Sequence, residues 1–321
     1  NPLERGTDAS IMARILVTND DGVQDPGLRI LVDELVQEGH DVFVVAPADD
    51  CSAMSMRLTL HQPLEVQFVN DWTKPDAKGK FLGAVGVSGS PCDCILVALS
   101  GGLERWSEGF VPDLLVAGIN LGPNLGTDIN HSGTVGAARE GALHGVPALA
   151  TSLASRDEDA LPAAAEATLA VVRRLLQILP EEPINYLRPD LSDVPWCKPL
   201  GHTEGHEDLV RAAIAFGCAD LWFNLNIPPA ATTLDVESCV PGLNIYRNAV
   251  RRTKNDAYVI GEAVIEKPAI EGTDVTTVMN GRSSLSVMPL WPSGHPLCVD
   301  LCMIEAARKR GERGWPALLE R

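Results

Sequence analysis

The stretch ILVTNDDGVQDPGLRILVDELVQEGHDVFVVAP, residues 15–47, determines the fold class of this chain. It begins with the apolar run 15–17, which is typical of a short buried strand. Leucine and valine residues then recur at helical spacing between Leu28 and Val36, and Gly39 closes the pattern. A second apolar run, 42–46, follows. Strand, helix and strand with short links predict two parallel strands joined by a right-handed crossover.

The alternation continues to about residue 180. Its predicted elements are a helix capped by Ser90 with Pro91 in its first turn, a strand at Leu114–Ala117, a helix at about Thr134–His144, a strand at Val146–Thr151, and an amphipathic helix carrying Ala165, Leu169, Val172, Leu176 and Leu179. This order predicts a Rossmann-like, doubly wound α/β fold with a mostly parallel sheet.

The composition of the sequence changes after Pro180, where prolines and glycines become frequent. We expect short strands at Leu221–Ile227, Ala257–Ile265 and Ser283–Val287, and a final helix near Leu297–Arg310. The predicted organisation has three parts. These are a disordered extension or tag remnant (1–11), a Rossmann-like catalytic core (12–180) and a strand-rich C-terminal part packed on the same domain (181–321).

Charge and composition exclude several classes of function. The chain carries 43 acidic and 26 basic residues, a formal net charge of -17, so we expect no binding to duplex nucleic acid. No apolar run approaches the ~20 residues that a membrane-spanning helix needs. The eight cysteines are scattered and form no CxxC pair, which favours reduced thiols and a cytoplasmic location.

Polar residues follow three of the predicted strands. Asn19, Asp20 and Asp21 end the first strand, Ser52 follows the second, and Asn120 and Asn124 follow the third. In open α/β sheets, ligands bind outside the carboxyl ends of the strands. We therefore expect these side chains to converge on one site.

The Asp20-Asp21 pair indicates a metal site. Two adjacent carboxylates after a buried strand repel each other, and burying either one unpaired is costly. A hard cation such as Mg²⁺, Mn²⁺ or Ca²⁺ relieves both costs, because it prefers oxygen ligands. The alternative is a solvated turn, since Asn-Asp-Asp-Gly also has turn composition.

Ser132-Gly133-Thr134 comes directly before a predicted helix. Free backbone amides and the positive end of the helix dipole make that position suitable for phosphate. The alternative is a simple helix cap, which Ser or Thr often provides. The segment is neither a P-loop nor a GxGxxG fingerprint, and this disfavours a nicotinamide cofactor.

These segments together resemble the stationary-phase survival protein SurE family. The resemblance rests on ILVTNDDG (15–22), AP (46–47) with Ser52, GSPCDC (89–94) and PDLLVAGINLGPNLGTDINHSGTVGAAREG (112–141). Weaker matches lie at 224–228, 272–275 and 286–290. The family comprises metal-dependent 5'/3'-nucleotidases or acid phosphatases. Its Rossmann-like core carries a C-terminal hairpin that is exchanged between subunits, which gives dimers and often tetramers.

The resemblance implies a site, residue by residue. One divalent ion per subunit, Mg²⁺ or Mn²⁺ with Ca²⁺ as a substitute in crystals, would be held by Asp20, Asp21, Ser52 and Asn120. Phosphate would contact Ser132, Gly133 and Thr134, with Asn19 and Asn124 nearby. Asp20, Asp21, Asn120 and Ser132 would carry catalysis, in which an activated water or an aspartate attacks the phosphorus of a nucleoside 5'- or 3'-monophosphate.

The chain departs from the family pattern at two positions. Ala53 follows the metal-binding serine where the family usually has glycine, and His131 stands where an aromatic residue is common.

Two other classes of function stay open. A phospho-receiver module also has an acidic pair after its first strand, but Asn120 occupies the place of its acceptor aspartate. A non-catalytic nucleotide-binding scaffold would bind nucleotide without releasing phosphate.

Overall fold

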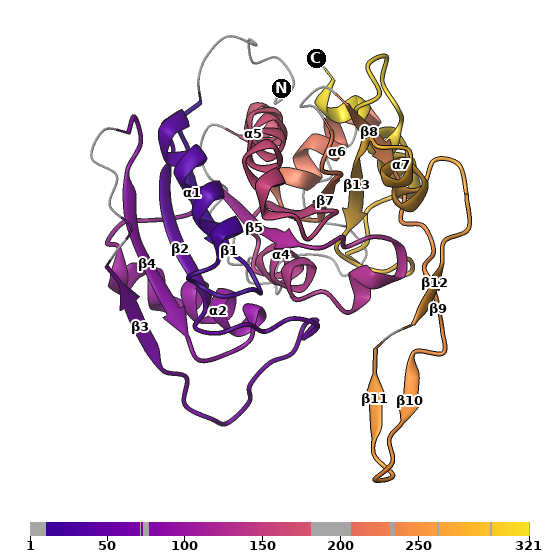
Figure 1. Ribbon diagram of the computed structural model, residues 1–321. Helices are drawn as coiled ribbons and strands as arrows, with labels where there is room; N and C mark the ends of the chain where they lie inside the picture. Colours follow the sequence, from indigo (N-terminus) through magenta and orange to yellow (C-terminus); the bar gives the residue numbers. More distant parts are fainter. Residues whose placement is uncertain are drawn as a thin grey trace.

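A nine-stranded sheet runs through the computed structural model, which describes residues 11–70, 72, 77–180, 207–231, 235–261, 263–295 and 297–320 (Figure 1). In spatial order its strands are β3 (Val66–Val69), β4 (Phe81–Val87), β2 (Asp41–Pro47), β1 (Arg14–Thr18), β5 (Leu114–Leu121), β6 (Ala148–Leu153), β7 (Leu221–Ile227), β13 (Ser283–Pro289) and β8 (Val236–Cys239).

The six strands from β4 to β7 are parallel to one another. The edge strand β3 is antiparallel to β4, and β13 is antiparallel to β7. Strand order runs outward from β1 through β2 to β4 on one side, and from β5 through β6 to β7 on the other. The predicted Rossmann-like, mostly parallel α/β fold is confirmed, and its topological switch point lies between β1 and β5.

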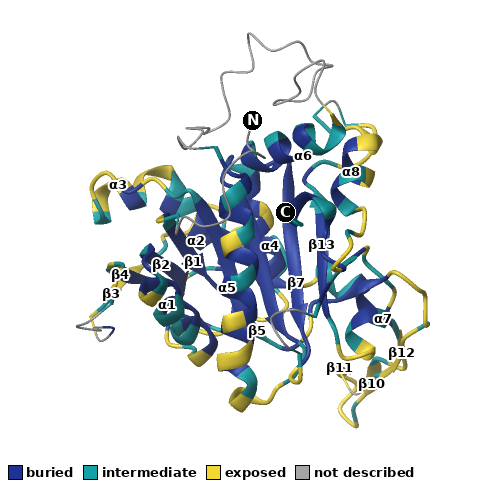
Figure 2. Ribbon diagram, turned by 90° about the horizontal axis from the view of Figure 1, so that it is seen from above, coloured by how far each residue is buried: buried dark blue, intermediate teal, exposed yellow. Residues whose placement is uncertain are grey.

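Helices cover both faces of the sheet, and the central strands are buried between them (Figure 2). On one face lie α1 (Pro26–Glu38), α5 (Leu161–Ile178), α6 (Asp208–Gly217) and α8 (Leu301–Arg308), whose apolar side chains pack with Ile15 and Val17. On the other lie α2 (Pro91–Val97), its π-helical extension (Ala98–Gly102), α3 (Leu103–Trp106) and α4 (Gly133–Leu143), which pack with Leu16. Alternate residues of β1 therefore serve two cores.

Several predicted elements are confirmed. Ser90 caps α2 in a reciprocal capping box with Asp93, and Pro91 occupies the first turn. Leu221–Ile227 is β7, and α8 covers the centre of the predicted final helix. The parallel strand β4 and its antiparallel neighbour β3 were not predicted; in β4 the sequence FLGAVGV gives an apolar pattern interrupted by glycines.

The predicted strand at Ala257–Ile265 is wrong. Two short strands occupy this stretch, β11 (Tyr258–Ile260) and β12 (Val264–Glu266), with Gly261 between them at φ +148°. β11 pairs with β10 (Val250–Arg252), whereas β12 pairs with β9 (Ile245–Arg247). We call residues 245–266 the arm, since these strands extend away from the sheet in Figure 1.

The C-terminal part joins the same sheet, because β7, β13 and β8 continue it beyond β6. It also contributes α7 (Asp274–Met279) and, after α8, a short 3-10 helix (Ala317–Leu319). Residues 1–10 and most of the segment 177–220 that separates the matched motifs lie outside the described residues. The division of the chain at about residue 180 stays a prediction. Within the described residues, no helix combines the length and apolarity needed to cross a membrane.

His40, at the junction of α1 and β2, makes the stability of the fold sensitive to acid. Its ring is 2% exposed, and neither ring nitrogen has a hydrogen-bond partner among the described residues. Burial lowers its pKa; the nearby Arg173 also lowers it, while Glu38 and Asp41 act in the opposite direction. The unfolded chain therefore takes up a proton at a higher pH than the folded protein does.

We predict that the free energy of unfolding falls as pH decreases below about 6.5, by at most about 1.4 kcal/mol per pH unit from this residue. His40→Leu, which does not titrate, should lose less stability than the wild-type protein between about pH 7.5 and pH 5.5. Urea unfolding of both proteins at each pH measures the difference. Equal losses would show that His40 is not the sensitive group.

Candidate active site at the switch point

The predicted site residues come from loops at the switch point of the sheet. Asp20 and Asp21 follow β1, and Asn120 is the next-to-last residue of β5, the strand that pairs with β1. The helix α4 begins at Gly133, after the loop that leaves β5. The carboxyl ends of β1 and β5 thus bring the acidic pair, the amide and a helix N-terminus to one place.

Thr134 joins Asp20 to Asn120. Its hydroxyl donates to Asp20 Oδ1 and lies 3.5 Å from Asn120 Oδ1. Asp20 is 3% exposed and Thr134 is fully buried. Burial raises the pKa of Asp20, and hydrogen bonds from the Thr134 hydroxyl and backbone amide partly oppose that rise. Thr134 therefore fixes the position of the Asp20 carboxylate and brings two potential metal-ligand oxygens, one after β1 and one on β5, close together.

Asp21 is half-buried beside it. The Leu121 amide lies 3.4 Å from Asp21 Oδ2, so this carboxylate also faces β5. Burial and, after it, the negative charges of Asp20, Asp25 and Asp50 together raise the pKa of Asp21 to about 7, while the hydrogen bond from the Leu121 amide partly opposes the rise. A cation at this position would relieve both the burial and the repulsion.

The loop after β2 meets the site through its backbone. The Cys51 amide donates to the Asp20 carbonyl at 2.8 Å. Ser52 is exposed, and its hydroxyl donates to Asp50 Oδ1 at 2.6 Å. In this structure Ser52 is thus turned toward Asp50, and its role as a metal ligand stays a prediction.

Ser132 and Gly133 form the start of α4. Ser132 is its N-cap and accepts a hydrogen bond from the Val135 amide at 3.0 Å. Gly133 packs so closely on Asp20 that an added Cβ would lie 2.8 Å from Asp20 Cβ and Oδ2, and 3.1 Å from Pro91 Cγ. A glycine at this position is what allows the helix N-terminus to approach the carboxylate.

Asn19 and Asn124 shape the loops of the site. The Asn19 side chain spans the turn, donating to the Gly22 carbonyl at 2.9 Å and accepting from the Gly22 amide at 3.2 Å. Asn124 is buried and donates to Ser152 Oγ at 2.8 Å, while its backbone amide donates to Asn226 Oδ1 at 2.7 Å. The structure therefore shows both residues holding backbone in place; contact with substrate stays a prediction.

Three residues that position the site were not assigned a role from the sequence. Asn224 and Asn226 on β7 both donate to the Asn124 carbonyl at 3.0 Å. Asp274, at the start of α7, accepts from the Gly126 amide at 2.9 Å. Two asparagines alternating within an otherwise apolar buried strand were an available signal, since buried amides need partners.

The donor set fits a hard divalent cation. It comprises two carboxylates, one amide oxygen and the loop that carries Ser52, and oxygen ligands of this kind suit Mg²⁺ or Mn²⁺. The described residues contain no cluster of three or more His, Cys, Asp or Glu placed to hold a metal. A site here therefore depends on the amide and hydroxyl oxygens as well as the two aspartates.

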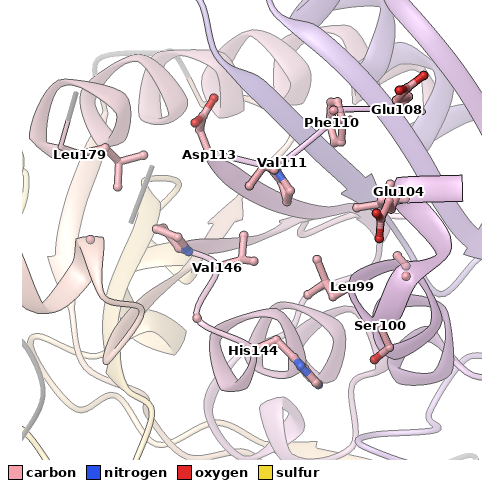
Figure 3. Close-up of a pocket in the computed structure, with 18 of the residues that line it drawn as sticks. Leu99, Ser100, Glu104, Glu108, Phe110, Val111, Asp113, His144, Val146 and Leu179 are labelled. Carbon is pink, nitrogen blue, oxygen red and sulfur yellow. The ribbon is translucent and has the colours of Figure 1, made fainter. Parts of the chain in front are cut away.

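A cavity of about 800 Å³ lies at the opposite end of the strands, where their amino ends are (Figure 3). Its lining includes Leu99 and Ser100 from the π-helical segment after α2, residues 108–113 before β5, and His144 after α4. The parallel strands β5 and β6 begin there. None of the predicted site residues lines this cavity, so it is separate from the acidic pair.

A family model described as "Survival protein SurE" matches residues 15–255. The chain belongs to the SurE family. A protein named 5'-nucleotidase SurE from Stenotrophomonas maltophilia (strain R551-3) is 34% identical over 299 residues, which are 92% of this chain and 93% of its own. A protein of the same name from Thermosynechococcus vestitus is 43% identical over 171 residues, 53% of this chain and 59% of its own.

The solved structure of SurE protein from Aquifex aeolicus has a TM-score of 0.59 and 26% sequence identity to this chain. The superposition covers 88% of this chain and 95% of that one. The SurE family is metal-dependent in general, in agreement with the acidic donor set described above.

The contact of Gly133 with Asp20 generates a prediction about metal binding. In Gly133→Ala the new methyl group would displace the Asp20 carboxylate from Thr134. We expect Mn²⁺ affinity to fall at least about tenfold, since ligand geometry or its support typically contributes that much. Titration calorimetry with Mn²⁺ measures the affinity.

Gly141→Ala in the same helix is the matched control. Its added Cβ would lie 2.2 Å from Leu115 Cδ2 in the core and not at Asp20. Both variants should lose about 1–3 kcal/mol of stability through overpacking. Only Gly133→Ala should lose metal affinity; an equal loss in Gly141→Ala would assign the effect to general destabilisation.

Proposed function

We propose that this chain is a metal-dependent phosphomonoesterase that hydrolyses nucleoside 5'-monophosphates, and also 3'-monophosphates, to nucleoside and phosphate. The observation that carries the proposal is the position of Thr134, which joins Asp20 to Asn120 at the N-terminus of α4. An acidic oxygen cluster and a helix N-terminus then lie side by side. The curated relatives named 5'-nucleotidase SurE support the substrate class.

Asp20, Asp21, Asn120 and Ser52 would hold one divalent ion, with Mg²⁺ or Mn²⁺ favoured by the all-oxygen donors. When bound, the ion supplies positive charge that stabilises the phosphoryl oxygens during displacement. Ser52 must turn from Asp50 to join this set. Thr134 restricts the Asp20 carboxylate to a single orientation, which reduces the reorganisation needed on binding.

Ser132 and Gly133 would hold the phosphate. The Ser132 hydroxyl accepts from Val135 and retains its own proton to donate. The Gly133 amide lies in the first turn of α4, where backbone N–H groups have no partner within the helix. The positive end of the helix dipole adds to their attraction for an anion. Thr134 lies behind them and acts through Asp20.

Asp21 is the candidate to orient the attacking water and accept its proton. It is the less buried of the two aspartates, and the Leu121 amide contacts only its Oδ2. Its other oxygen, Oδ1, would receive the proton. The water would attack the phosphorus in line with the leaving nucleoside oxygen, which would take up a proton from solvent as the P–O bond breaks.

The two other functions considered from the sequence are less favoured. Asn120 takes the place of a receiver's acceptor aspartate, and relatives over more than nine-tenths of the chain are named as nucleotidases.

We also propose that the chain forms a homodimer or homotetramer through the arm. Its exposed apolar residues, such as Tyr258, Ile260 and Val264, support that assembly. A cytoplasmic location stays a prediction from the scattered thiols.

Phosphate release tests the function. Wild-type protein should release phosphate from nucleoside monophosphates in the presence of Mg²⁺ or Mn²⁺, and EDTA should abolish the release. Asp20→Ala and Asp21→Ala should each lose at least about a hundredfold in kcat/KM while circular dichroism stays unchanged. Asp159→Ala, an exposed acid before α5, is the control and should keep full activity. Wild-type turnover in either site variant would refute the proposal.

Light scattering tests the assembly. Ile260, on β11, is 83% exposed, so Ile260→Glu should leave the fold intact but place a charge in an apolar contact between subunits. We expect the measured mass to fall from that of the dimer or tetramer toward that of the single chain. A monomeric wild-type protein, or an unchanged mass in the variant, would argue against assembly through the arm.

A further inference from the structure

Residues 242–246, which we call the arm root, lead into the arm and contact the loop that precedes α4. This loop, residues 124–131, ends next to Ser132 and Gly133. Gly126 and Gly242 approach so closely that a Cβ on Gly126 would lie 3.0 Å from the Gly242 carbonyl carbon. Asp274 accepts hydrogen bonds from both of their amides, at 2.9 and 2.6 Å. Segments more than a hundred residues apart in sequence are thus packed backbone to backbone.

Two side chains of this loop bond to the start of the arm: the Thr127 hydroxyl donates to the Asn244 carbonyl at 2.8 Å, and the Asp128 carboxylate accepts from Tyr246 and Asn244. Tyr246, on β9, donates its hydroxyl to Asp128 Oδ1 at 2.7 Å. Asn244 donates its Nδ2 to Asp128 Oδ2 at 2.7 Å and to the Leu125 carbonyl at 3.2 Å. Each carboxylate oxygen of Asp128 therefore has one donor from the arm root, and the two bonds together determine where the side chain lies.

The backbone of Asp128 in turn holds the start of α4. Its carbonyl accepts from the His131 amide at 2.9 Å and from the Ser132 amide at 3.2 Å. Ser132 then caps the helix through its hydroxyl. A continuous chain of hydrogen bonds runs from the Tyr246 hydroxyl through Asp128 to Ser132.

We infer that Tyr246 and Asn244 are positioning residues for the phosphate site, acting through Asp128 on Ser132 and Gly133. The inference rests on the proposed function of those two residues in binding phosphate. Neither Tyr246 nor Asn244 contacts the acidic pair. Their effect should therefore appear in the binding of phosphate and not in the binding of metal.

Tyr246→Phe gives the cleanest test, because the side chain is 45% exposed and the change removes one hydroxyl while keeping the ring. Loss of one hydrogen bond to a charged acceptor should weaken the hold on Asp128. We expect the inhibition constant of inorganic phosphate and the KM for a nucleoside 5'-monophosphate to rise about three- to tenfold. Mn²⁺ affinity should stay within about twofold of the wild-type value.

Tyr258→Phe is the matched control. Tyr258 lies on β11 of the same arm and is 67% exposed, farther along the chain from the 124–131 loop. It should leave KM, phosphate inhibition and metal affinity unchanged. Asn244→Asp is a second variant, which places a carboxylate against Asp128 and should weaken phosphate binding more than Tyr246→Phe does.

Hydrogen exchange adds a readout that does not depend on turnover. Amides of residues 131–135 should exchange about three- to tenfold faster in Tyr246→Phe than in wild-type protein, while amides of α5 stay unchanged. If wild-type protein releases no phosphate from nucleotides, the proposed function fails, and exchange still tests the positioning. Wild-type values of KM, phosphate inhibition and exchange in Tyr246→Phe would overturn the inference.

Discussion

Two adjacent carboxylates, one of them buried, follow the first strand of the sheet, and the negative charges of Asp20, Asp25 and Asp50 act on Asp21. This arrangement is unfavourable on its own, since burial and mutual repulsion both oppose ionisation. The surrounding structure is built to hold it. Thr134 donates to Asp20, Gly133 provides the space in which the carboxylate lies, and the Leu121 amide faces Asp21. The charges named as acting on the pair are acidic, and the divalent cation that we propose here would balance them.

This constraint also explains why the site is assembled from several strand ends. A single loop could place two aspartates together, but it could not surround them with neutral oxygens at fixed positions. Asn120 comes from the neighbouring parallel strand, and Thr134 comes from the helix that follows it. The switch point leaves a gap between the loops of β1 and β5, which run to opposite sides of the sheet. Under the proposed function, a small phosphorylated molecule would reach both the acids and the helix N-terminus there.

The features that depend on local sequence were predictable. Apolar runs and helical spacing predicted β1, α1, β2 and β7, and the Ser-Pro pair predicted the start of α2. The convergence of Asp20 with Asn120 followed from parallel pairing alone. Ser52 was different, because its orientation depends on whether its hydroxyl bonds to Asp50 or turns toward the aspartates. The arm was mispredicted as one strand because Gly261 interrupts an otherwise continuous apolar pattern.

The hydrogen bonds that hold the 124–131 loop could not be predicted from the sequence, because each one joins residues that are far apart along the chain. Glycine and asparagine make this loop able to turn sharply, but they also make it costly to order. Its order comes from Asn224, Asn226, Asn244 and Asp274, all of which belong to the C-terminal part. The C-terminal part therefore orders a loop of the candidate site, in addition to the role in assembly that we propose for its arm. Residues before 180 supply every proposed ligand for metal and phosphate, yet the loop that leads to Ser132 and Gly133 takes its shape from residues a hundred or more positions later in the chain.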